Sequence, residues 1–174
     1  MRLSTFLLVA GLAHATLAQD RFPALQGERA DGSAVELPGK PNTPFIVIGL
    51  ACSQKAQPAL EAWYEPAYLR FVAKHGLFAN AYTTEVYFVP LFTGVNKAAY
   101  APSLKKFRKS AEPEVADRVV FVKEDGDEVR QALGLKNKDI PYFFVVDREG
   151  RIVHRAEGNF NEDKLEAIEE VLLR

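Results

Sequence analysis

Four short, predominantly apolar runs, rich in β-branched and aromatic side chains, recur along the chain at residues 45–50, 86–91, 118–122 and 142–147. A run of this length without polar alternation is typical of a strand that is buried on both faces, as in a parallel sheet. Because parallel strands need crossover connections, we expect the segments between the runs to form covering helices. The runs therefore predict a single α/β domain.

The segments between these runs carry apolar residues at helical spacing. Residues 60–72, 97–109 and 127–133 show this spacing, each between two predicted strands. The fourth run continues through a tight turn into residues 151–155, which predicts a C-terminal antiparallel hairpin. We therefore expect a mixed central sheet with helices on both faces, in a three-layer α/β/α sandwich.

Single residues mark the expected ends of these helices. Pro66 is expected to kink or interrupt the first helix, and Gly76 to close it. Gly134 is expected to end the short third helix. Asn161 is expected to cap a final helix, whose first turn carries acidic residues that suit its positive end.

The first 18 residues predict a cleaved export signal. Arg2 provides the positive start, residues 6–13 form an apolar stretch, and Ala18 ends the segment with a small residue. An uncleaved membrane anchor is the alternative, but the apolar stretch is shorter than the roughly 20 residues that span a bilayer. We therefore expect a signal peptide at residues 1–18, one domain at residues 19–174, and a periplasmic or secreted protein without a stable membrane span.

Composition excludes several classes of protein. The 22 basic and 23 acidic residues give a net charge of −1, so the chain lacks the excess positive charge of a nucleic-acid binder. With one cysteine, Cys52, neither an intramolecular disulfide nor a multi-cysteine zinc site can form. The thiol of an exported protein can then be buried and inert, pair with another molecule, or act chemically.

Three segments resemble the thioredoxin-like superfamily, and in particular its redoxin-type members. Residues 22–38 are similar to the redoxin N-terminal extension, and residues 45–52 to the strand that leads to the active-site turn. Residues 140–152 resemble the segment that opens with the family's cis-proline and runs into the last hairpin. A narrower resemblance, at residues 61–68 and 133–152, is to the thioredoxin-like assembly factors of mitochondrial ATP synthase, which do not need a dithiol.

The chain departs from the family at the active-site motif. Cys52 is followed by Ser53, Gln54 and Lys55, so the second cysteine of the Cys-x-x-Cys motif is replaced by lysine. The threonine and proline of the peroxiredoxin pattern are also missing. The resemblance therefore implies a binding, assembly or chaperone-like module with an accessory thiol. The alternative is a single-cysteine thiol oxidoreductase or peroxidase that uses Cys52 with an external reductant.

The resemblance places the candidate site at two loops. Cys52 would be the nucleophile, with its pKa lowered by a helix N-terminus and by Lys55. Alignment on Pro58 instead places Cys52 inside the turn, and a buried space-filling cysteine is the alternative to a nucleophile. A cis bond between Ile140 and Pro141 would expose the Ile140 backbone to a bound peptide, whereas a trans proline would simply begin a strand.

No cofactor or metal site is expected. His75 and His154 lie far apart in the sequence, and no spacing of a known ligand set surrounds them. The lysines at residues 105–109 predict a solvated helix face, with a partner surface as the weaker alternative. The expected partners are a client protein or peptide, or a thiol reductant.

Overall fold

The computed structural model describes residues 21–73, 81–124 and 126–174. The predicted signal peptide and the positions of His75 and Gly76 lie outside these residues. Within them, no helix is long and apolar enough to cross a membrane.

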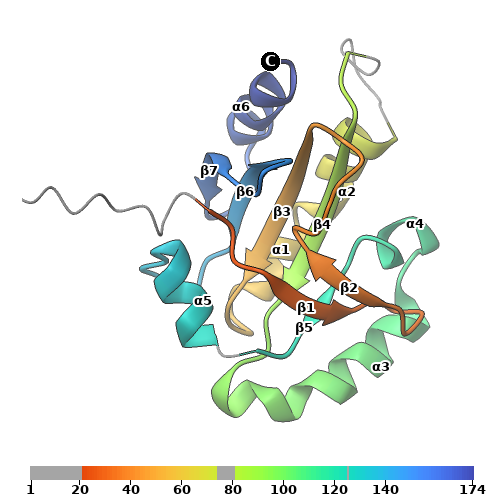
Figure 1. Ribbon diagram of the computed structural model, residues 1–174. Helices are drawn as coiled ribbons and strands as arrows, with labels where there is room; N and C mark the ends of the chain where they lie inside the picture. Colours follow the sequence, from red (N-terminus) through yellow and green to blue (C-terminus); the bar gives the residue numbers. More distant parts are fainter. Residues whose placement is uncertain (1–20, 74–80, 125) are drawn as a thin grey trace, which may run out of the picture.

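The centre of the molecule is a mixed sheet with strand order β4-β3-β6-β7 (Figure 1). β3 (Phe45–Ala51) pairs in parallel with β4 (Thr84–Pro90) and antiparallel with β6 (Tyr142–Asp147). β7 (Ile152–Glu157) closes the C-terminal hairpin against β6. Most residues of β3, β4 and β6 are buried, as expected for continuous apolar runs that are covered on both faces.

The predicted third strand joins two sheets. Its last two residues form β5 (Phe121–Val122), which pairs with β1 (Leu25–Glu28). The same segment also runs parallel to β4, through bridges of Val119 with Phe88 and of Val122 with Leu91. The segment therefore extends the central sheet beyond β4 and ties it to the N-terminal strands.

One face of the central sheet is covered by strands as well as by a helix. β2 (Ala34–Leu37) completes a small sheet of order β2-β1-β5, and α5 (Gly126–Leu133) lies beside it (Figure 1). The sequence correctly predicts helices on both faces, but on this face α5 shares the layer with β1 and β2. A short, alternating strand such as β2 can occupy this position because one side of it contacts the core while the other faces water.

The other face of the sheet is covered by helices. The predicted first helix is divided into α1 (Gln57–Glu61), α2 (Tyr64–Ala67) and the π-helical η2 (Tyr68–Val72), so the interruption expected near Pro66 is present. α6 (Glu162–Leu172) packs beside them, with the Asn161 side chain accepting a hydrogen bond from the Lys164 amide at 2.9 Å, as predicted.

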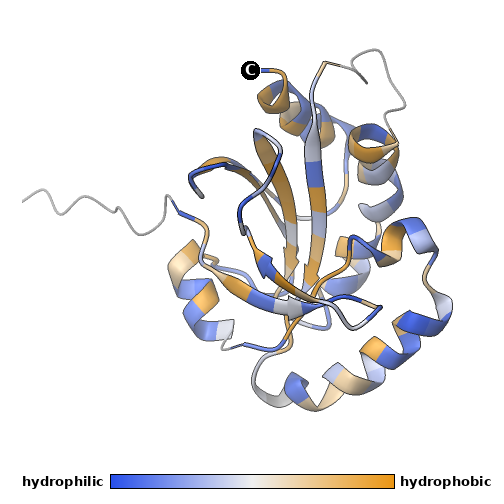
Figure 2. Cartoon of the chain, turned by 45° about the vertical axis from the view of Figure 1, so that its right-hand side comes forward, coloured by the Kyte–Doolittle hydropathy of each residue, from blue (hydrophilic) through white to orange (hydrophobic). Residues whose placement is uncertain are grey.

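A further helical segment lies at the β5 end of the molecule (Figure 1). It consists of η3 (Gly94–Ala99), α3 (Tyr100–Ser110) and α4 (Pro113–Ala116). Leu104 anchors α3 in the core, and Tyr100 and Phe107 pack around Phe121 at ring distances of 6.3 and 5.3 Å. Figure 2 shows apolar positions alternating with polar ones along α3.

The core on the helical face is organised around Trp63. Its ring lies 4.0 Å from the ring of Phe143 on β6 and 5.3 Å from that of Phe160, which precedes α6. The indole N–H donates to the Gly158 carbonyl at 3.3 Å. This aromatic group therefore fixes the broken helix against both the sheet and the start of α6.

Candidate functional site

Cys52 lies directly after β3, at the position where the sequence places the candidate nucleophile. Its side chain is only 3% exposed, and it belongs to the apolar cluster on the face covered by β1, β2 and α5. The helix that follows begins five residues later, at Gln57. Cys52 is therefore inside the protein and before the turn, instead of at a helix N-terminus.

The electrostatic surroundings of Cys52 disfavour a thiolate. Burial raises the pKa of the Cys52 thiol to about 12, and the positive charge of Arg130 on α5 opposes this shift only in part. The sequence predicted a lowered pKa, and that prediction is wrong. The reason is that the thiol is removed from water and lacks the helix-terminal position that the lowered pKa requires.

Lys55 takes part in a different interaction from the predicted one. Its ammonium nitrogen lies 3.6 Å from Asp139 Oδ2, and its side chain is 81% exposed. Ser53 Oγ donates to the other oxygen of Asp139 at 3.0 Å and accepts from the Ala56 amide at 3.3 Å. Asp139 thus bridges two residues of the turn after Cys52 and holds that turn against the loop before β6.

The loop before β6 is also ordered by its own hydrogen bonds. The Asp139 amide donates to Asn137 Oδ1 at 2.9 Å, and the Asn137 amide donates to the Tyr142 hydroxyl at 3.0 Å. The fold thus brings the two predicted halves of the site together, one carrying Cys52 and Lys55 and the other Ile140 and Pro141. The contact depends on Asp139, which the sequence analysis missed; no motif distinguishes this carboxylate from a surface one.

The peptide bond between Ile140 and Pro141 is trans, so the expectation of a cis bond is wrong. Among the described residues, the cis bond lies instead between Leu37 and Pro38. The trans form is the favoured isomer of an X–Pro bond in the absence of other constraints. Here the Pro141 carbonyl accepts from the Gly158 amide at 2.8 Å and continues the hairpin pairing. The partly buried Ile140 side chain packs against the cluster that contains Cys52.

A small hollow lies beside this loop, between the end of α5 and the β6–β7 hairpin. Its volume is about 170 Å³, and leucine and aromatic side chains form much of its wall. Arg155 packs over the Phe144 ring at 5.5 Å and donates to the Leu133 carbonyl at 2.7 Å. The lining residues are Leu133, Gly134, Leu135, Tyr142, Phe144, Arg155, Ala156 and Glu157.

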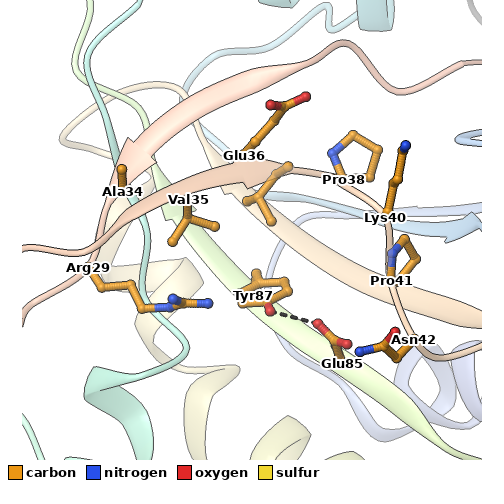
Figure 3. Close-up of a pocket in the computed structure, with 12 residues that line it drawn as sticks. Arg29, Ala34, Val35, Glu36, Pro38, Lys40, Pro41, Asn42, Glu85 and Tyr87 are labelled. Carbon is orange, nitrogen blue, oxygen red and sulfur yellow. Dashed lines mark hydrogen bonds between the residues drawn. The ribbon is translucent and has the colours of Figure 1, made fainter.

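A larger, polar hollow of about 330 Å³ lies between β2 and β4 (Figure 3). The Tyr87 hydroxyl donates to Glu85 at 2.7 Å, and the Arg29 guanidinium carbon lies 5.9 Å from the centre of the Tyr87 ring. Burial and the bond to Glu85 raise the pKa of Tyr87. The hollow is lined by two basic residues, Arg29 and Lys40, and by two acidic ones, Glu36 and Glu85. It therefore has no net charge with which to select a charged ligand.

Metal-binding residues do not gather anywhere in the part of the chain that the structure describes. No group of three or more histidine, cysteine, aspartate or glutamate side chains there could hold an ion. Burial, with a smaller contribution from Arg174, lowers the pKa of the half-buried His154. The partial burial of His154 on β7 thus favours the neutral imidazole.

Comparison with known proteins identifies the architecture. No family model and no curated protein matches the sequence, whereas many solved structures match the fold. One is an uncharacterised conserved protein from Geobacillus kaustophilus, with a TM-score of 0.60, 17% identity, and coverage of 89% of this chain and 81% of the other. Another is the exposed lipoprotein thioredoxin Etrx1 from Streptococcus pneumoniae, with a TM-score of 0.56, 13% identity, and coverage of 85% of this chain and 99% of the other. The chain has a thioredoxin-like fold.

A third similar structure belongs to a protein named for assembly. BsSco, a member of the Sco family of cytochrome c oxidase assembly proteins, has a TM-score of 0.56 and 13% identity over 87% of this chain and 93% of its own. Identities this low establish the thioredoxin-like fold alone. What this chain can do must therefore be argued from its own site, the buried Cys52 and the Asp139 bridge across the loops beside it.

Proposed function

We propose that this protein is an exported thioredoxin-like binding module that holds client polypeptides during assembly and does not use its thiol for catalysis. The observation that carries the proposal is the burial of Cys52, with a pKa raised to about 12. The thiolate is the nucleophilic form of cysteine. At pH 7, a pKa of about 12 leaves roughly one thiol in 100,000 ionised, too few for an efficient nucleophile.

The proposed client surface comprises the loop at Ile140 and Pro141 and the hollow beside it. At about 170 Å³ the hollow is smaller than the roughly 300 Å³ at which small-molecule sites begin. It suits one apolar side chain of a bound peptide, with Glu157 at its wall to contact neighbouring polar groups. An assembly role is supported by the similarity to BsSco, and export by the signal-like residues 1–18 and the similarity to the exposed lipoprotein Etrx1.

A single-cysteine thiol oxidoreductase is the second candidate function. Two observations favour it: Cys52 directly follows the buried strand β3, and the charge of Arg130 favours the thiolate. BsSco, moreover, is described with a disulfide switch. In this function the Cys52 thiolate attacks a substrate disulfide and forms a mixed disulfide, releasing one substrate thiolate. An external thiol then attacks the mixed disulfide and regenerates Cys52. The turn held by Asp139 would have to open first.

One assay separates the two functions, namely the precipitation of insulin chains during reduction with dithiothreitol. A binding module holds the released chains and delays precipitation, whereas an oxidoreductase accelerates their release. We expect a delay that is the same for wild type and Cys52→Ala. Acceleration that is lost in Cys52→Ala would establish the second candidate, and the absence of any effect at tenfold molar excess of the protein would contradict client binding.

Two further measurements locate the activity. Glu157→Lys, at the hollow, is expected to shorten the delay, whereas the matched exposed variant Glu65→Lys on α2 leaves it unchanged. Alkylation of Cys52 with iodoacetamide at pH 8 is expected to be slow in the native protein and rapid in urea. The pH dependence of the alkylation rate gives an apparent pKa for the thiol. A value below the roughly 8.5 of a free thiol would contradict the buried assignment.

A further inference from the structure

Charge is segregated along this nearly neutral chain. Residues 93–111 contain five basic residues and no acidic one, and α6 contains five acidic residues and a single lysine. Client binding does not explain the excess positive charge of residues 93–111 or the excess negative charge of α6, because the proposed client surface lies on other elements. The separation of charge therefore has another cause.

The basic residues of α3 form one exposed face. Lys105, Lys106 and Lys109 are all exposed. Lys109 follows Lys106 by three positions and Lys105 by four, so the three side chains lie within about 100° of the helix surface. Arg108 is engaged separately, with Glu28 and with the Ala30 carbonyl. Among the described ion pairs, none includes the three lysines, so their charges are available to a partner.

The acidic residues of α6 form a matching face. Asp163, Glu166 and Glu170 are exposed and lie three and four positions apart, along about 10 Å of helix. The other two carboxylates of the helix, Glu162 and Glu169, pair with Arg70. In the described part of the chain, no ion pair includes the three exposed carboxylates. Each helix has 11 residues, and the lysines occupy a shorter stretch, residues 105–109, than the carboxylates, residues 163–170.

The two faces cannot meet within one molecule. In both views of the chain α6 lies at the top and α3 at the bottom, with the central sheet between them (Figures 1 and 2). Opposite charges on opposite ends are complementary only between two copies. A contact of one patch with a different patch repeats from copy to copy, and so it is heterologous and head-to-tail.

We propose that the lysine face of α3 binds the carboxylate face of α6 on a second copy of this chain. Three lysines meet three carboxylates, and the small exposed residues Ala98 and Ala101 at the other end of the basic segment allow close approach. The contact is polar, so it is weak and salt-dependent. It is independent of the proposed client binding, because it uses neither Cys52 nor the hollow at Glu157.

Sedimentation velocity of the purified protein tests this association. In 20 mM NaCl we expect the weight-average mass to rise above the mass of the monomer as concentration increases. In 500 mM NaCl we expect the association constant to fall at least about tenfold, because the screening length shortens to a few ångströms. A mass that stays at the monomer value up to about 0.5 mM protein in 20 mM NaCl overturns the proposal.

Charge reversal identifies the surfaces involved. Lys105→Glu, Lys106→Glu and Lys109→Glu together are expected to abolish association. The matched control reverses three exposed lysines elsewhere, Lys40→Glu, Lys136→Glu and Lys138→Glu, which changes the net charge equally. We expect this control to associate. Equal loss in both variants overturns the proposal, because the effect is then one of net charge.

Carbodiimide coupling provides a direct readout that does not depend on a variant. The reagent joins a lysine amine to a touching carboxylate through an amide bond, with loss of water and no spacer. In a mixture of ¹⁴N- and ¹⁵N-labelled protein we expect mixed-isotope cross-links from α3 lysines to Asp163, Glu166 or Glu170. Intermolecular cross-links that lie only elsewhere, for example at Glu112, assign the contact to another surface and overturn the proposal.

Discussion

Substitution of Gly49 by alanine is expected to destabilise the protein strongly, although it adds a single methyl group. A Cβ at this position would lie 2.5 Å from Phe143 Cε1 and 3.0 Å from Leu60 Cδ1. Unstrained carbon atoms pack about 3.5–4.0 Å apart, so the overlap with the Phe143 ring is roughly 1 Å. Gly49 is paired with Phe88 on one side and with Phe143 on the other, so the β3 backbone cannot move away.

The ring that would have to yield is itself confined. Phe143 is 1% exposed and its ring centre lies 4.0 Å from that of Trp63, which is fully buried. Overpacking a tight core costs about 1–3 kcal/mol. Because neither the β3 backbone nor the Phe143 ring can move aside, we expect a cost at the upper end of this range, about 3 kcal/mol. That loss corresponds to a melting temperature lower by about 6–12 °C for a domain of this size.

Urea denaturation measures the effect directly. With a slope of about 2 kcal/mol per molar, the midpoint of Gly49→Ala is expected to fall by about 1.5 M. Phe143→Leu removes ring atoms that the new methyl group would meet. The double variant should therefore lose about 1 kcal/mol less unfolding free energy than the two single variants lose in sum. Gly94→Ala is the control: no atom lies within 4 Å of its Cβ, and its positive φ costs about 1 kcal/mol. A midpoint for Gly49→Ala within 0.3 M of wild type would refute the packing argument.

Three further substitutions test polar contacts by urea denaturation. Asp147 accepts hydrogen bonds from the Glu149 and Arg151 amides and from the Arg151 side chain. Burial raises the pKa of Asp147, but these contacts outweigh it and the net shift is downward. Asp147→Asn should therefore cost about 2 kcal/mol at pH 7. Arg70→Gln removes the cation that contacts buried Glu169 at 2.8 Å and should cost about 3 kcal/mol. Asn161→Ala removes the α6 cap and should cost about 1 kcal/mol.

The dependence on pH distinguishes the Asp147 effect from simple loss of packing. A carboxyl whose folded pKa is below its unfolded pKa of 3.8 stabilises the protein above pH 3.8, and this stability is lost as the pH falls through the folded pKa. The difference between wild type and Asp147→Asn should therefore be full at pH 7 and should decrease as the pH falls below 3.8. A difference that is constant from pH 7 to pH 2 would contradict the ionic assignment. For Arg70→Gln and Asn161→Ala, effects below about 0.3 kcal/mol would contradict the contacts assigned to them.

The sequence predicts the order of elements well because each element depends on local pattern. The fourth apolar run coincides with β6, since a continuous apolar stretch has no polar face to expose and must be covered on both sides. Asn161 is found as the α6 cap because a short polar side chain before an amphipathic segment satisfies the free amides of the first turn. Pro66 divides the first helix for an equally local reason.

The sequence is less informative about how the sheet is covered. The small sheet of β1, β2 and β5 depends on the antiparallel pairing of Gly27 with Val122, which lie 95 positions apart. A Cβ at Gly27 would lie 2.4 Å from Val120, so the close approach requires glycine. No local pattern identifies the distant partner of such a strand. The sharing of this layer between α5 and two strands is therefore a property of the tertiary structure.

The alternation of strands and helices can be read from the residues, as can the position of the one cysteine after a buried strand and the lack of a second cysteine with which to form a disulfide. What that cysteine can do depends on tertiary contacts. The pKa of Cys52 depends on burial beneath the layer of β1, β2 and α5, and the turn after it depends on Asp139, 86 positions away from Ser53. Desolvation and long-range hydrogen bonds arise from contacts between distant segments, so they are absent from any local pattern of residues.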